Sequence, residues 1–107
     1  MCRYYEWQKN GKERIPYFIK HRDDKLMFFA GLYDCTVLEG EKDPLWTFTI
    51  VTTMANKDFD WLHERQPVIL STQQAIDAWL DTSSQTWTDE LTKLVEPYHD
   101  PASPLEW

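Results

Sequence analysis

Residues 3–19 read RYYEWQKNGKERIPYFI, and this stretch decides the fold. Its two halves are rich in aromatic and β-branched residues, which favour strands. Between them stands Asn10-Gly11, a dipeptide typical of tight hairpin turns. We therefore expect an antiparallel hairpin, with strands over residues 3–8 and 15–19. Pro16 lacks a backbone N–H, so it should lie at the start of a strand or at a sheet edge.

Two more apolar stretches follow the hairpin. Residues 26–37 are expected to form one long strand, with Gly31 as a bulge or a point of close packing. Cys35 lies in this stretch, and we expect it to be a buried, unreactive thiol. Residues 46–53 alternate aromatic or β-branched residues with threonines, which is the clearest strand pattern in the chain.

From residue 72 onward the pattern becomes helical. Ser71 and Gln74 have the spacing of a capping box. Apolar residues then recur at helical intervals, namely Ala75, Ile76, Trp79 and Leu80. A second short helix is expected over residues 88–95, capped by Thr86 or Thr88 and ended by Pro97. A strand-rich first two-thirds followed by two short helices indicates an α+β domain built on an antiparallel sheet or part of a barrel.

Charge and length limit the possible functions. The 107 residues are enough for one domain, and 18 acidic against 11 basic side chains give a net charge of −7. This sign disfavours general nucleic-acid binding, which depends on neutralising phosphates. Any such role would need a local basic patch, and residues 9–22 hold five Lys and Arg side chains. A solvated hairpin surface explains these charges equally well.

No targeting segment or cofactor motif stands out. Residues 1–3 run straight into aromatic and charged residues, and no apolar run approaches the ~18 residues that span a bilayer. Cys2 and Cys35 do not make a disulfide framework. The three histidines have no metal-ligand spacing with them, and the three glycines form no phosphate loop. We expect an intracellular protein, away from membranes, with neither metal nor cofactor.

Two residues are candidates for proton transfer, Glu6 and His63. A carboxylate and an imidazole that meet in a fold can share acid–base work near neutral pH. On a strand Glu6 and Tyr5 must point to opposite faces, so Glu6 faces either a pocket or solvent. His63 stands between a strand and a helix, where functional residues concentrate, although many single histidines are structural.

Cys2 and Arg65 complete the set of candidates. If Met1 is removed, Cys2 offers a thiol and an α-amine on one residue. Arg65 is two residues beyond His63, so an extended segment would put both on one side, with the guanidinium able to hold a phosphate. The alternative for Arg65 is a weak surface ion pair, for example with Glu64.

Together, these segments resemble the SOS response-associated peptidase (SRAP) family. Order and spacing agree over about residues 4–95. The matching stretches are YYEW (4–7), PYFI (16–19), FAGLYD (29–34), TFTIVTT (47–53), LHERQPVIL (62–70) and WL (79–80). The resemblance implies an SRAP-like α+β fold, partial in residues 1–107, with an antiparallel sheet or barrel followed by two short helices.

The resemblance also implies a chemistry. Family members capture abasic sites in single-stranded DNA through a cysteine after the initiator methionine, whose amine and thiol form a thiazolidine with the ring-opened aldehyde. By resemblance, Cys2 is this nucleophile, Glu6 and His63 assist proton transfers, Arg65 binds phosphate, and Trp7 lies near the DNA path. The implied class is an SRAP-type cysteine peptidase and crosslinking protein, which cleaves its own propeptide. We expect a monomer, nuclear in a eukaryote or cytoplasmic in a bacterium.

The chain departs from the family pattern at its start. Cys2 is followed by Arg3 rather than by Gly, and the long segment that normally separates this cysteine from the Tyr-Glu-Trp motif is missing. Gln66 replaces a usual methionine. A second hypothesis is therefore a non-enzymatic module whose exposed aromatic residues bind a partner chain.

Overall fold

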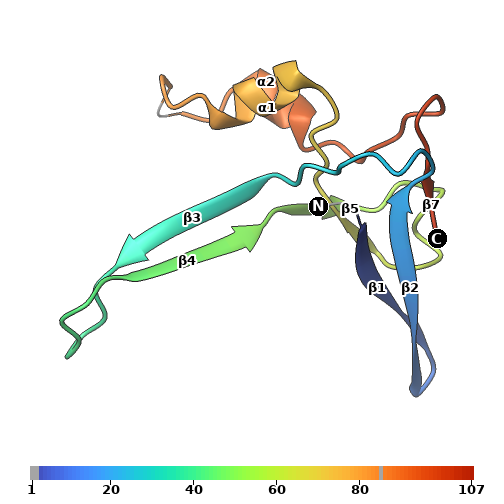
Figure 1. Cartoon of the computed structure of the whole chain (residues 1–107), viewed down its shortest axis with the longest axis horizontal. Helices are drawn as coiled ribbons and strands as arrows, with labels where there is room; N and C mark the ends of the chain where they lie inside the picture. The colour runs from blue at the N-terminus through green and yellow to red at the C-terminus, as the bar shows by residue number, and fades with distance from the viewer. Residues whose placement is uncertain (1–2, 85) are drawn as a thin grey trace.

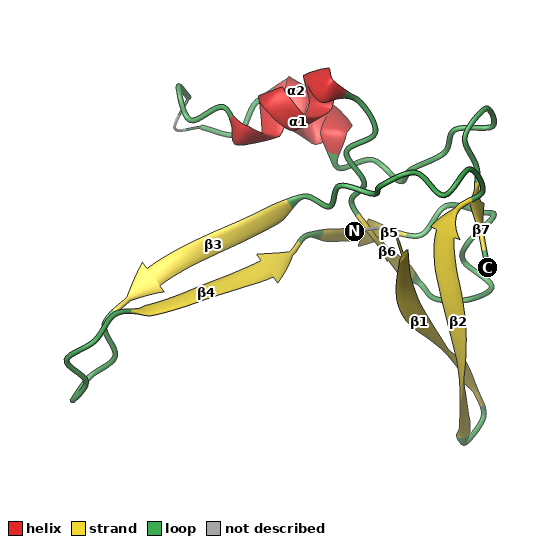
Figure 2. Cartoon of the chain, in the orientation of Figure 1, coloured by secondary structure: helices red, strands yellow, loops and turns green. Residues whose placement is uncertain are grey.

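The computed structural model describes residues 3–84 and 86–107, and it confirms the α+β class (Figure 1). Strands form small antiparallel groups, and two short helices pack together on one side (Figure 2). The elements are β1 (Arg3–Asn10), β2 (Glu13–His21), β3 (Gly31–Thr36), β4 (Leu45–Ile50), β5 (Thr52–Met54), β6 (Arg65–Pro67), α1 (Gln73–Leu80), α2 (Asp89–Leu94) and β7 (Leu105–Glu106).

The β1–β2 hairpin forms as predicted. Asn10 pairs with Glu13, and Gly11 takes a φ of +62° in the two-residue loop, a conformation that favours glycine. β7 completes this sheet but pairs only with the last two residues of β2, Lys20 and His21. Pro16 therefore lies where β2 has no second neighbour in the described sheet, so its missing N–H costs no ladder bond.

The β3–β4 hairpin extends away from the rest of the molecule (Figure 1). The expected strand over residues 26–37 begins only at Gly31, because Met27 and Ala30 leave the ladder and are buried in the core. Gly31 confirms the expected close packing, since a Cβ there would lie 3.3 Å from the carbonyl oxygen of Thr49. The prediction for Cys35 was wrong: it is an exposed free thiol, because every residue of β3 and β4 is exposed.

Three chain segments meet at the centre of the molecule. The backbone N–H groups of Ala30, Val51 and Val68 each donate to a carbonyl of another of the three, all at 2.9 Å. This junction interrupts the predicted strand over residues 46–53, which becomes β4 and β5 on either side of Val51. Residues 68–70 then run through the interior, where all three side chains are buried.

The helices cover this junction. Trp79 of α1 packs against the Ala30, Val68 and Leu70 cluster, and its indole N–H donates to the Gly31 carbonyl at 3.0 Å. The N-terminal cap of α2 is Thr88, which is one of the two residues predicted for this position. The cap of α1 is Thr72 rather than Ser71, because Thr72 Oγ1 accepts the N–H of Ala75 at 3.0 Å.

Removal of this cap gives a first test. We expect Thr72→Ala to lower the free energy of unfolding by about 1 kcal/mol, because the Ala75 N–H loses its acceptor at the helix start. Urea unfolding followed by circular dichroism measures the change. Ser71→Ala is the matched control and should change stability little. An equal loss in both variants would contradict the assignment of Thr72 as the cap.

Candidate functional site

Glu6 lies on the face of β1 that packs against the core. Alternate residues Tyr4, Glu6 and Gln8 are half-buried, whereas their neighbours on the strand are exposed. Across the hairpin Glu6 stands opposite Tyr17, and one carboxylate oxygen accepts the backbone N–H of Trp7 at 3.1 Å. Of the two orientations left open by the sequence, Glu6 takes the one toward the interior.

His63 follows directly on a buried anchor, Leu62. Leu62 packs with Ile19 and Phe59, and the backbone N–H of Leu62 donates to the Phe59 carbonyl at 2.9 Å. The imidazole Nδ1 lies 3.1 Å from both the N–H and the carbonyl oxygen of Arg65. Because the Arg65 backbone engages Nδ1, Nε2 is the ring nitrogen left for proton transfer.

The structure brings these two residues into one region of the molecule. Tyr4, on the same face as Glu6, packs against the cluster that contains Leu62. Gln8, on the other side of Glu6, donates through Nε2 to the Trp61 carbonyl at 3.0 Å. Glu6 thus lies between two residues that hold β1 against residues 61–62, immediately before His63. The strand that carries Glu6 and the loop that leads into His63 are therefore held together, because Tyr4 and residues of this loop share one core cluster.

Arg65 is fixed by a threonine rather than by an acidic side chain. Its Nε donates to Thr52 Oγ1 at 2.9 Å, and its Nη2 donates to the Thr52 carbonyl at 2.6 Å across the β5–β6 pair. Two of the five guanidinium donors are used in this way, and the side chain remains exposed. A guanidinium held from behind by two bonds can still present its remaining N–H groups to a phosphate oxygen.

Trp7 lies on the opposite face from Glu6. It shares the outer face of the hairpin with Tyr5 and Phe18, and half of its side-chain surface is exposed. Arg3 stacks on this face too, with its guanidinium carbon 5.0 Å from the centre of the Phe18 ring. Any ligand that contacts both Trp7 and Glu6 must therefore pass around the edge of β1.

The predicted basic patch over residues 9–22 is weaker than its composition implies. Lys20 forms ion pairs with Asp24 at 2.8 Å and with Glu106 at 3.1 Å. Hydrogen bonds to these two carboxylates raise the pKa of Lys20 above its usual value, so its charge is present but already partnered. The patch therefore does not offer Lys20 as a free cation for phosphate.

Tyr4, which shares a face of β1 with Glu6, was not singled out by the sequence reasoning. Its hydroxyl is buried and has no hydrogen-bond partner among the described residues. Burial, together with the nearby charge of Glu6, raises the pKa of Tyr4 above its ordinary value, so the hydroxyl stays protonated. The two-residue period of a strand places Tyr4 on the face of Glu6, and this signal was available in the sequence.

Tyr4→Phe tests the cost of this unpaired hydroxyl. We expect the variant to raise the free energy of unfolding by about 1 kcal/mol, because a buried polar group without a partner is removed while the ring packing remains. The raised pKa adds a pH dependence. The parent chain should lose stability above about pH 10, because the phenol then ionises in the unfolded chain but stays protonated in the folded one. Tyr4→Phe should not show this loss. Chemical denaturation at pH 7 and pH 10.5 measures both effects; a less stable variant at pH 7 would contradict the assignment.

The remaining expectations concern Cys2, metal binding and membrane segments. Cys2 lies outside residues 3–84 and 86–107, which the structure describes. Among those residues no group of three His, Cys, Asp or Glu side chains could hold a metal ion. Likewise, none of the helices in the described ranges is both long and apolar enough to cross a membrane.

Comparisons with known proteins agree with the sequence pattern. A family model described as SOS response associated peptidase (SRAP) matches residues 1–107. An abasic site processing protein of Saccharomyces cerevisiae is 47% identical over 102 residues, which cover 94% of this chain and 27% of the relative. The abasic site processing protein YoqW of Bacillus subtilis is 39% identical over 97 residues, covering 89% of this chain and 42% of the relative.

A vertebrate relative and a solved structure likewise align with most of this chain but with less than half of their own length. The abasic site processing protein HMCES of Gallus gallus is 36% identical over 88% of this chain and 33% of its own length. A crystal structure of a Bacteroides thetaiotaomicron protein superposes with a TM-score of 0.80 at 30% identity, over 97% of this chain and 45% of that one. The chain thus spans less than half the length of each of these four proteins.

Proposed function

Since the chain belongs to the SOS response-associated peptidase family, we propose that it is part of a protein that captures abasic sites in single-stranded DNA. Residues 1–107 would form part of one SRAP domain. Three relatives that align with most of the chain are named abasic site processing proteins, which supports this function. The observation that carries the proposal is the position of Glu6, held on the core face of β1 against the loop that leads into His63.

The proposed reaction uses both groups of Cys2. After removal of Met1, the α-amine adds to the aldehyde of the ring-opened abasic sugar, and loss of one water gives an imine. The thiolate then adds to the imine carbon, the nitrogen takes up a proton, and a thiazolidine ring closes. The first step needs proton delivery to the departing oxygen, and the second needs removal of the thiol proton. Glu6 and Nε2 of His63 would serve as this acid and base. The same Cys2 would release a propeptide where one precedes it.

Arg65 would hold the strand beside the reacting sugar. Its side chain is exposed, it directly follows the His63 loop, and two bonds to Thr52 fix its direction. These features suit a bidentate contact with a phosphate of the DNA strand. Trp7, on the outer face of the hairpin, would stack on a base as the strand passes the edge of β1.

A single incubation tests this function. The chain is mixed with a single-stranded oligonucleotide that contains one abasic site, and the products are heated in detergent before electrophoresis. The proposal predicts a slower-migrating protein–DNA species that survives heating, and none with the same oligonucleotide carrying an intact base. Absence of the heat-stable species with the abasic strand would contradict the proposal for this chain.

One observation favours a second function, the binding of a partner chain. All residues of β3 and β4 are exposed, and one face of this hairpin presents Tyr33, Trp46, Phe48 and Ile50. Phe48 exposes 81% of its surface. Contiguous apolar surface of this kind, next to open strand edges, promotes association.

The association can be measured on the chain itself. We expect the 107-residue chain to self-associate as its concentration rises, and Phe48→Lys to remove this dependence, because the charge disrupts the apolar face. Thr47→Lys is the matched control, since Thr47 is on the opposite face of the same strand. Sedimentation velocity distinguishes the two; a monomeric parent chain at all concentrations, or an equal effect of both variants, would contradict the expectation.

A further inference from the structure

A cleft of about 420 Å³ is lined by residues other than the candidate proton-transfer and phosphate-binding side chains. Three segments distant in sequence line it: Arg22 directly after β2, the loop over residues 56–59, and parts of residues 98–107. Glu6, His63 and Arg65 are not among its lining residues. Its volume falls within the range of roughly 300–1,000 Å³ that is usual for small-molecule sites.

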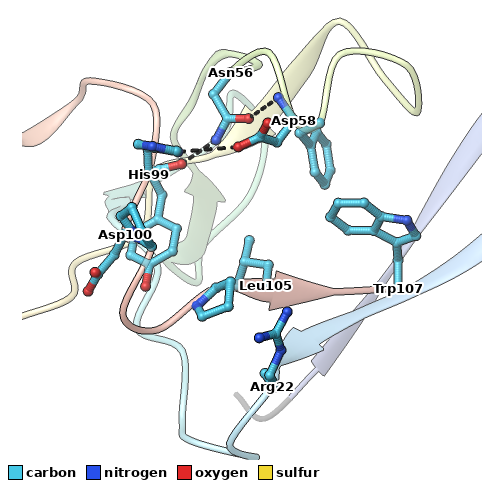
Figure 3. A pocket seen from close by; sticks show the side chains of 11 residues that line it. Arg22, Asn56, Asp58, His99, Asp100, Leu105 and Trp107 are labelled. Carbon is cyan, nitrogen blue, oxygen red and sulfur yellow. Dashed lines mark hydrogen bonds and ion pairs between the residues drawn. The ribbon is translucent and has the colours of Figure 1, made fainter.

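The positively charged side chain of Arg22 lies at one end of the cleft. The guanidinium of Arg22 points into it (Figure 3), while the backbone N–H of Arg22 donates to the Pro104 carbonyl at 3.0 Å. The guanidinium itself has no hydrogen bond or ion pair among residues 3–84 and 86–107. A planar guanidinium with free donors is the side chain best suited to bind a phosphate through two bonds.

The carboxylate side chain of Asp58 lies at the opposite end. Asp58 Oδ2 lies 3.3 Å from His99 Nδ1, and the backbone N–H of Asp58 donates to Asn56 Oδ1 at 2.8 Å (Figure 3). Asn56 is held in turn by a hydrogen bond from its Nδ2 to the Tyr98 carbonyl. The second acid, Asp100, accepts the N–H of Ala102 at 3.0 Å, and its side chain points away from the cleft. Asp58 is therefore the acceptor that faces a ligand.

Aromatic rings line the space between the two charged ends. Phe59 and Tyr98 form part of its wall, and Trp107 flanks it on the side opposite His99 (Figure 3). Trp107 exposes 49% of its surface, and its ring packs at 5.4 Å against Trp61, which holds it in place. A half-exposed, supported indole is a good stacking platform for a planar base.

We propose that this cleft binds a nucleotide whose base carries an exocyclic amine. The phosphate would bind Arg22, the base would stack on Trp107, and the amine would donate to Asp58. Carboxylates accept hydrogen bonds from the N4 amine of cytosine in this manner. An amino-acid zwitterion also carries opposite charges, but it would leave much of a 420 Å³ cleft unfilled. The proposal does not depend on Cys2 or on abasic-site capture.

Titration with deoxycytidine 5′-monophosphate tests the site directly. We expect millimolar additions to shift the Trp107 indole and Arg22 side-chain NMR signals. Arg22→Ala should weaken binding about tenfold, because a charge-assisted contact is lost. The substitution keeps the backbone bond to Pro104, so the fold at this point is preserved. Arg14→Ala removes the same charge near the turn of the β1–β2 hairpin, where Arg14 is not among the lining residues; it is the control and should leave binding unchanged.

Base preference tests the role of Asp58. The parent chain should bind deoxycytidine 5′-monophosphate more tightly than thymidine 5′-monophosphate, which has no exocyclic amine, and Asp58→Asn should remove most of this preference. Absence of binding, equal binding by Arg22→Ala, or tighter binding of phenylalanine than of either nucleotide would each overturn the proposal.

The nucleotide can come from two sources, free in solution or within a DNA strand. Adding a single-stranded cytosine oligonucleotide without an abasic site to the nucleotide-loaded chain separates them. If the oligonucleotide displaces the mononucleotide, and does not do so in Arg22→Ala, the cleft binds a nucleotide within a DNA strand. If the mononucleotide stays bound, the ligand of the cleft is a free nucleotide. Because the oligonucleotide has no aldehyde, both results are independent of covalent capture.

Discussion

Cys2→Ala is expected to abolish the heat-stable crosslink to an abasic site. Alanine keeps the α-amine after removal of Met1, so the reversible imine can still form, but no thiol remains to close the thiazolidine ring. Borohydride should therefore still trap a reduced imine in the variant, whereas heating without reductant should release all of the DNA. Denaturing electrophoresis with and without borohydride measures both species.

Cys35→Ala is the control for this prediction. Cys35 is an exposed free thiol on β3, and it has no α-amine beside its sulfur. Its replacement should leave the amount of heat-stable product unchanged. If Cys2→Ala forms as much of that product as the parent chain, Cys2 is not the nucleophile; if Cys35→Ala loses it instead, the exposed thiol of β3 has taken that role.

Glu6→Gln and His63→Gln are expected to slow the crosslinking about a hundredfold each, while the final product stays the same. Loss of a positioned acid or base costs a reaction of this kind roughly 10²-fold or more. Glutamine at position 6 retains an oxygen that can accept the Trp7 N–H, so the strand should keep its geometry. Single-turnover rates with excess protein over abasic strand give the effect.

Glu64→Gln is the matched control, since Glu64 adjoins His63 but is exposed. It should react at the parental rate. Thermal unfolding, followed by tryptophan fluorescence, separates a chemical effect from a loss of folding. Parental rates in both Glu6→Gln and His63→Gln, with unchanged unfolding, would remove the two residues from the mechanism.

Local patterns in the sequence predicted the hairpin and the helices well. The Asn10-Gly11 turn and the capping threonine before α2 depend on neighbouring residues, and both are found. The break at Val51 was not predictable in this way. It depends on backbone bonds to Ala30 and Val68, which come from segments 17 or more positions away, and no local pattern contains them.

Burial was harder to predict than secondary structure. An apolar strand normally packs against a core, and on that basis Cys35 was expected to be buried. The structure leaves both faces of the β3–β4 hairpin uncovered in the described part of the chain, so the same composition gives an exposed aromatic arm. A pattern of apolar residues shows that a surface can be buried, but not which segment covers it.

The sequence named Glu6 and His63 as candidates, but it did not predict how the strand and the loop that carry them are arranged. Strand alternation placed Glu6 and Tyr5 on opposite faces, and the structure agrees. The approach of β1 to the His63 loop depends on the shared cluster of Ile19, Phe59 and Leu62, which is a long-range contact. The cleft was not foreseen either, because Arg22, Asp58 and Trp107 come from three segments distant in sequence that line one cleft only in the folded chain.

The mass of the crosslinked species tests the central claim most directly. The parent chain is reacted with an abasic single strand, the DNA is trimmed with a nuclease, and the modified peptide is analysed by tandem mass spectrometry without reduction. Capture through Cys2 predicts an N-terminal peptide, beginning at Cys2, that carries the remaining sugar phosphate with the loss of one water. A modified peptide from any other part of the chain, or an unmodified Cys2 peptide in the crosslinked band, would contradict it.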